Sequence, residues 1–97
     1  MAKFGLLVRL EAKPGKQQEL EDFLKSALPL AQQELFTRHW FAFKLGPTTF
    51  GIYDTFETEE ARSAHLSGPI AQALMTHAPD LLTSGPVIEP FELLALK

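Results

Sequence analysis

Few side chains in this sequence could carry out chemistry, and His65 is the strongest candidate among them. An imidazole titrates near neutral pH, so His65 could accept a proton or hold the anion that results. The alternative is a helix histidine that bonds a nearby backbone group or carboxylate. The two other histidines, His39 and His77, do not add a metal site, because His65 and His77 are separated by a Gly-Pro break.

Three other side chains could contact a ligand. Trp40 is large and flat and could stack on a planar ring, although core packing or an interface between subunits would also explain a lone tryptophan on a strand. Arg9 interrupts an apolar strand and could balance a substrate anion, but a pairing with Glu89 or Asp54 is the interpretation we favour. Met75 follows the Gly-Pro break, and we favour core packing over a role in a lid.

Composition sets limits on the class of protein. A chain of 97 residues, 45% hydrophobic and 22% charged, suits one globular domain spanning 1–97. The absence of cysteine excludes disulfides and a cysteine nucleophile and fits a reducing cytoplasm. A net charge of −3 without a basic cluster argues against nucleic acid as a partner. The first apolar run is short and carries Arg9 and Glu11, so we expect neither a signal peptide nor a membrane span.

Periodicity predicts the elements that must position these residues. Residues 3–12, 39–45, 49–56 and 87–96 have the pattern of strands, and Pro90 indicates that the last is an edge strand or bulged. Residues 16–35 have helical spacing, with a kink or break expected at Pro29. Thr58 is a suitable N-cap for a helix to Leu66, and residues 70–78 are helical again, with Pro79 as the predicted stop.

The predicted order is β-α-β-β-α-β, an α+β fold of the ferredoxin-like type with a four-stranded antiparallel sheet. Apolar side chains occur on both faces of the predicted strands, because adjacent residues point to opposite faces and pairs such as Leu6 and Leu7 or Ala42 and Phe43 are both apolar. Two helices can cover only one face of such a sheet, so the other face would be a large exposed apolar patch. We therefore predict a homodimer in which a second copy covers that face.

Three segments of the chain resemble a known family. They are the strand, turn and helix start LLVRLEAKPGKQQELEDFL at 6–24, the segment FGIYDTFETEEARSAHL at 50–66, and the final strand after GPVIEP at 85–90. In the second segment Phe56 stands nine residues before His65. These segments are similar to the antibiotic biosynthesis monooxygenase domain of the dimeric α+β barrel superfamily, and together they cover most of the chain.

The resemblance implies a cofactor-independent oxygenase that acts on a quinol or phenolic aromatic, with no metal and no flavin. The substrate anion supplies the electrons, and the protein binds the ring system and excludes water. By this resemblance His65 is the catalytic candidate, and Trp40, Phe43, Phe56, Met75 and Arg9 are the candidates for binding the substrate. Phe56 replaces a tryptophan or tyrosine common in the family, so it keeps an apolar wall without a hydrogen bond.

Two alternatives and one exclusion accompany this hypothesis. Haem degradation, found in the same superfamily, is excluded because the chain has no asparagine, and because His65 and Met75 stand where that branch has a tryptophan and a histidine. A non-catalytic homodimer that binds a small apolar ligand is the main alternative, and a related isomerase or decyclase is another. Asp54 stands at an acidic position of the family, where we predict that it caps the second helix or pairs with Arg9.

Overall fold

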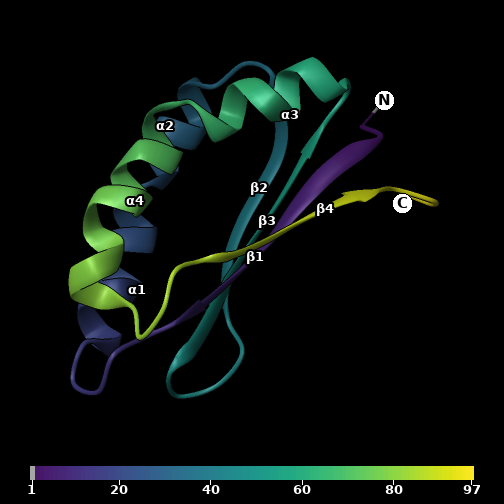
Figure 1. Ribbon diagram of the computed structural model, residues 1–97. Helices are drawn as coiled ribbons and strands as arrows, with labels where there is room; N and C mark the ends of the chain where they lie inside the picture. The colour runs from purple at the N-terminus through teal and green to yellow at the C-terminus, as the bar shows by residue number, and fades with distance from the viewer. Residues whose placement is uncertain (1) are drawn as a thin grey trace.

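The computed structural model describes residues 2–97. It contains one four-stranded antiparallel sheet with the strand order β2-β3-β1-β4 and four helices on one face (Figure 1). The strands are β1 (Phe4–Glu11), β2 (Thr37–Lys44), β3 (Thr49–Phe56) and β4 (Val87–Glu92). The predicted α+β, ferredoxin-like order is therefore confirmed, and β2 and β4 are the edge strands.

The helices follow the predicted segments, except that the last helix extends beyond its predicted end. They are α1 (Gln17–Ser26), α2 (Leu28–Gln33), α3 (Glu59–Leu66) and α4 (Pro69–Leu81). The expected break near Pro29 is present, since α1 ends before it and Pro29 lies in the first turn of α2, where a missing N–H costs little. Thr58 caps α3 by accepting a hydrogen bond from the Ala61 N–H at 3.1 Å, as predicted.

The predicted stop at Pro79 is wrong, because α4 continues through that residue to Leu81. Pro79 has no N–H to donate to the carbonyl of Met75, so α4 lacks one intrahelical hydrogen bond there. Beyond it Leu81 and Leu82 are buried, and the Leu82 N–H still donates to the Ala78 carbonyl at 2.9 Å. Burial of these two leucines therefore outweighs the local cost of the proline.

The last strand is also shorter than predicted. It ends at Glu92, and the segment that follows is irregular and places Leu94 almost entirely in solvent. The Leu93 N–H still donates to the Lys3 carbonyl at 2.7 Å, but the residues that follow form no strand. None of the helices in residues 2–97 has the length and apolar character needed to cross a bilayer.

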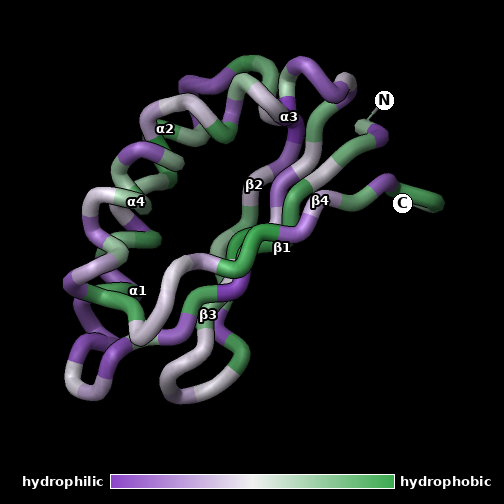
Figure 2. The backbone as a smooth tube through the Cα atoms, in the orientation of Figure 1, coloured by the Kyte–Doolittle hydropathy of each residue, from purple (hydrophilic) through white to green (hydrophobic). Residues whose placement is uncertain are grey.

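The main core lies between the helices and the sheet. In Figure 2 the helices alternate between hydrophilic and hydrophobic colours, as expected of amphipathic helices. Alternate residues of each strand face the helices. The buried cluster between the two layers consists of Val8, Leu10, Ala12, Leu20, Leu24, Phe50, Ile52, Leu74, Ala78, Leu81 and Leu82. The opposite face of the sheet, which no helix covers, will be called the outer face.

The outer face is lined by aromatic side chains. Phe41, Tyr53 and Phe91 follow one another across β2, β3 and β4, with ring centroids 6.1 and 5.2 Å apart. Two glycines lie directly under rings: a Cβ on Gly5 would approach Phe91 to 2.1 Å, and one on Gly51 would approach Phe43 to 2.4 Å. The rings therefore lie close against the backbone of the neighbouring strand.

Candidate functional site

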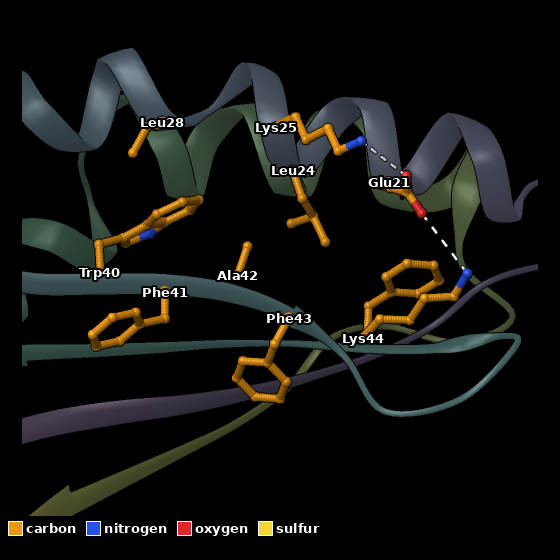
Figure 3. Close-up of a pocket in the computed structure, with 10 residues that line it drawn as sticks. Glu21, Leu24, Lys25, Leu28, Trp40, Phe41, Ala42, Phe43 and Lys44 are labelled. Atoms are coloured by element: carbon orange, nitrogen blue, oxygen red, sulfur yellow. Dashed lines mark hydrogen bonds and ion pairs between the residues drawn. The ribbon is translucent and has the colours of Figure 1, made fainter.

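A groove of about 500 Å³ separates α1 and the start of α2 from the edge strand β2 (Figure 3). We call it the α1–β2 groove, and it is lined by Glu21, Leu24, Lys25, Leu28, Trp40, Phe41, Ala42, Phe43, Lys44 and Phe50. Trp40 and Ala42 point toward the helices, whereas the rings of Phe41 and Phe43 point away from them (Figure 3). The groove is thus mainly apolar, and its size suits a small planar molecule.

Charged groups occupy one end of the groove. Glu21 accepts a hydrogen bond from the Lys25 ammonium at 3.0 Å and forms an ion pair with Lys44 at 3.8 Å. The bond from Lys25 and the charge of Lys25 are the main reasons that the pKa of Glu21 lies below its ordinary value. These groups are exposed, so they contribute little to stability, but they place opposite charges at the entrance.

His65 lies outside the groove, between two buried carboxylates. Its Nδ1 is 2.7 Å from Oε1 of Glu34, which follows α2, and its Nε2 is 2.9 Å from Oδ2 of Asp54 on β3. Exposure is only 5% for His65, 8% for Glu34 and 1% for Asp54. The three residues, here called the buried charge cluster, connect α3, β3 and the α2–β2 connection.

Burial and charge act in opposite directions on the pKa of His65. Burial lowers it, but the carboxylate of Asp54, followed by that of Glu34, outweighs burial and leaves the pKa of His65 above its ordinary value. Burial raises the pKa of Asp54, and the neighbouring His65 only partly offsets this increase. An imidazolium with a carboxylate at each nitrogen has no lone pair to offer a substrate.

The contact between His65 and Asp54 is electrostatic rather than a well-directed hydrogen bond. Their atoms are within ion-pair distance, yet among residues 2–97 neither oxygen of Asp54 has a hydrogen bond of good geometry. The predicted pairing of Asp54 with Arg9 is wrong, because Asp54 faces the helices and Arg9 lies on the outer face. The predicted cap on the second helix is made by Thr58 instead of Asp54.

The predicted site residues do not lie together. Trp40 contributes its side chain to the groove, and Phe43 borders the groove while its ring packs on Gly51 at the outer face. Phe56 is fully buried beside His65, with the ring centroids 5.3 Å apart. Met75 is 58% exposed on α4, and therefore does not pack in the core as we favoured.

Sequence reasoning missed the residues of α1 that form the opposite wall of the groove. Leu24 and Leu28 lie in the segment 16–35 that is predicted to be helical, and no ligand role is predicted for them from the sequence. Glu34 was missed as a partner of His65. Its position after the Pro29 break was a usable signal, because a carboxylate at the end of a short helix can reach a neighbouring element.

Comparison with known proteins shows which structures share this fold. The structure of NE2512, a protein of unknown function from Nitrosomonas europaea, is 59% identical and superimposes with a TM-score of 0.98, covering 100% of this chain and 94% of that one. A "putative antibiotic biosynthesis monooxygenase" from the same organism has a TM-score of 0.84 at 14% identity, covering 95% and 90% of the two chains. Another structure with this description, from Caulobacter crescentus, has a TM-score of 0.80 at 16% identity and covers 97% of this chain and 92% of that one.

These comparisons define the fold and the family. The fold is that of the antibiotic biosynthesis monooxygenase type, and it is shared by structures of low sequence identity. The chain belongs to the same family as NE2512 of Nitrosomonas europaea. No family model matches the sequence, and no curated protein matches it.

Proposed function

We propose that this protein is a cofactor-independent monooxygenase that binds a quinol or phenolic aromatic in the α1–β2 groove. The observation that carries the proposal is the groove itself, which has an apolar floor, one wall formed by Trp40 and a volume near 500 Å³. Such a site can bind a flat ring system and limit its contact with water. The absence of cysteine favours a cytoplasmic location.

The reaction balances without a further reductant. A substrate of the anthrone type loses two hydrogens from one ring carbon and gains one oxygen atom there. The second atom of O₂ leaves as water, so the substrate supplies all four electrons. The chain's own contribution is to hold the ring against Trp40 and to keep the charged groups Glu21, Lys25 and Lys44 near the entrance.

In this proposal His65 positions Glu34 and Asp54 and does not act as the base. Both of its ring nitrogens face carboxylates, and it does not line the groove. Phe56 supports the same cluster from the core. Arg9 and Met75 lie away from the groove and have no assigned part in binding.

Oxygen uptake by the purified protein with anthrone or a naphthohydroquinone tests the proposal. We expect a rate above the spontaneous oxidation, and we expect Trp40→Ala to reduce it by at least tenfold because the flat wall of the groove is removed. Leu94→Ala, which truncates an almost fully exposed leucine, is the matched control and should retain the rate. Uptake that persists unchanged in a folded Trp40→Ala variant would contradict the assignment of the groove.

Non-catalytic binding of a small apolar ligand is the second candidate function. It is favoured by one observation, namely that the charged groups lining the groove are engaged in ion pairs with one another. Binding of the aromatic probes without oxygen uptake above the spontaneous rate would select this function over the first.

We also propose that a second copy of the chain covers the outer face. Phe41 and Val87 are each about half exposed there, and Tyr53 and Phe91 connect them across the sheet. The face also carries Arg9 and Glu89, opposite charges on one surface, so two copies related by a twofold axis could pair them reciprocally.

The oligomeric state tests this arrangement directly. We expect a dimer by sedimentation equilibrium, and we expect Phe41→Asp to shift it to monomer because a charge would be buried in the interface. Leu66→Asp on the exposed part of α3 is the control and should remain dimeric. A wild-type protein that is monomeric at micromolar concentration would rule the proposal out.

A further inference from the structure

The two ends of the α1–β2 groove differ in chemical character. Trp40 lies at one end and Lys44 at the other, with Ala42 between them on the same strand (Figure 3). Alternate residues of a strand point to the same face, and four residues of a strand span about 13 Å. The groove is therefore elongated, and a ligand that fills it would contact an aromatic wall with one end and charged groups with the other.

Two ammonium groups share one carboxylate at the charged end. Glu21 accepts its hydrogen bond from Lys25 at 3.0 Å, whereas its contact with Lys44 is 3.8 Å long. A contact of that length is too long for a hydrogen bond, so the Lys44 ammonium retains N–H groups that can be donated to a ligand. Asp22, whose charge also acts on Lys25, accepts a hydrogen bond from Gln18 at 2.9 Å and does not line the groove.

The charge of this end defines which ligand group fits there. Two cations and one anion line the groove, so its lining has a net charge of +1 in a chain whose net charge is −3. The Lys44 Nζ lies 5.6 Å from the centroid of the Phe50 ring, which places the cation beside the apolar floor of the groove. A single carboxylate would balance the charge of the lining and accept a hydrogen bond from Lys44, whereas an ammonium group would be repelled.

We propose that the α1–β2 groove binds an elongated aromatic carboxylic acid, with its ring against Trp40 and its carboxylate at Lys44. An apolar spacer between the two groups would lie over Ala42, whose small side chain leaves room for it, and against Leu24 of α1. The proposal rests on the proposed function for the place of the site, and it adds an anionic group that the proposed reaction does not require. Lys44 is then the residue that selects the ligand by its charge.

Titration with 6-phenylhexanoate and its primary amide, at pH 7 and low ionic strength, tests the proposal. The two probes have the same ring and spacer, but only the acid is charged. Trp40 is the only tryptophan of the chain, so its fluorescence reports occupation of the groove. We expect the acid to bind the wild-type protein about fivefold more tightly than the amide, because the cations are partly exposed and water screens them. Added salt should reduce this preference.

Substitution of Lys44 separates recognition of the charge from recognition of the ring. In Lys44→Gln the lining of the charged end becomes neutral, so the preference for the acid should fall to about twofold or less. Lys16→Gln is the matched control, because Lys16 lies outside the groove and its side chain is 40% exposed, compared with 51% for Lys44. This control should retain the preference. Trp40→Ala, followed by calorimetry, should weaken the binding of both probes and leave the preference unchanged.

The outcomes separate this inference from the proposed function. If the wild-type protein binds both probes equally well and Trp40→Ala weakens both, the groove remains the site and the anionic ligand class is overturned. A Lys44→Gln variant that keeps the wild-type preference would overturn the role of Lys44. If neither probe binds but a quinol is oxidised in a reaction that depends on Trp40, the inference is overturned and the proposed function stands. If neither probe binds and no quinol is oxidised, both are overturned.

Discussion

Replacing His65 with leucine should lower the free energy of unfolding by about 3–5 kcal/mol. The reason is that the two carboxylates facing the ring, Glu34 and Asp54, would remain buried without their cationic partner. Removal of one member of a buried ion pair costs far more than the pair itself contributes, because an uncompensated charge is left behind. Urea denaturation followed by circular dichroism at pH 6 measures the effect.

Two further variants make this expectation specific. His77→Leu introduces the same side chain at an exposed position of α4 and should cost less than about 1 kcal/mol. Adding Glu34→Gln and Asp54→Asn to His65→Leu should restore part of the loss, since both buried charges are then removed. A His65→Leu variant as stable as His77→Leu would show that the buried charge cluster does not hold the three elements together.

The same cluster predicts how stability depends on pH. The folded pKa of His65 is raised above its ordinary value of 6.5, so its contribution is complete below pH 6.5 and is lost as the pH rises through the folded pKa. The pKa of Asp54 is also raised, from 3.8, so its contribution likewise decreases with rising pH. We expect the wild-type free energy of unfolding to fall above pH 6.5 more steeply than that of His65→Leu.

Paired denaturation series from pH 6 to 9 measure that difference. His77→Leu retains the cluster and should follow the wild-type slope. Parallel slopes for the wild type and His65→Leu would contradict the raised pKa of His65, because the folded state would then keep no proton on this ring that the unfolded state has already lost.

Phe56→Ala should cost about 3–5 kcal/mol of stability. Phe56 is 0% exposed and its ring contacts His65, so truncation leaves a cavity beside the buried charge cluster. The effect distinguishes a core position from the ligand-binding role expected from the family. Urea denaturation gives the cost, and titration with 1-naphthol gives the affinity of the variant that remains folded.

Trp40→Ala provides the contrast for this prediction. Trp40 is only partly buried and lines the groove, so its truncation should cost less stability and far more affinity. If Phe56→Ala instead left stability within about 1 kcal/mol of wild type and abolished binding, Phe56 would belong to the ligand site after all.

Local pattern was sufficient to predict most of the fold. Alternation identified all four strands, and Thr58 and Pro29 marked helix boundaries through their own local chemistry. The predicted end of the last helix at Pro79 was wrong because contacts distant in sequence outweigh the local preference of proline. Helix α4 continues past Pro79 because Leu81 and Leu82 are buried against β1 and its neighbours. The predicted extension of the last strand beyond Glu92 is wrong for a different reason, because the apolar alternation continues there while the backbone leaves the sheet after the hydrogen bond from Leu93 to Lys3.

The candidate site was less predictable than the fold. Trp40 could be selected by its type, but the groove depends on how far α1 lies from β2, which no short segment encodes. His65 could be selected as a candidate by its residue type, but its two carboxylate partners, Glu34 and Asp54, could not. They are 31 and 11 positions away in the sequence and lie on different elements. A residue that looks like a catalytic base in the sequence is thus enclosed by charges that only the tertiary structure brings together.

The two glycines under aromatic rings on the outer face have an evolutionary consequence. Any side chain at Gly5 or Gly51 would occupy the space of the Phe91 or Phe43 ring, and at Gly5 it would also meet the Asp54 carbonyl oxygen at 2.7 Å. The ring is the main obstacle only at Gly51, because the backbone oxygen beside Gly5 would remain after loss of the Phe91 ring. Among homologues of this chain, a small residue in place of Phe43 removes the main obstacle at Gly51, so these two positions should covary even though they lie on different strands, whereas Gly5 stays restricted by the backbone carbonyl.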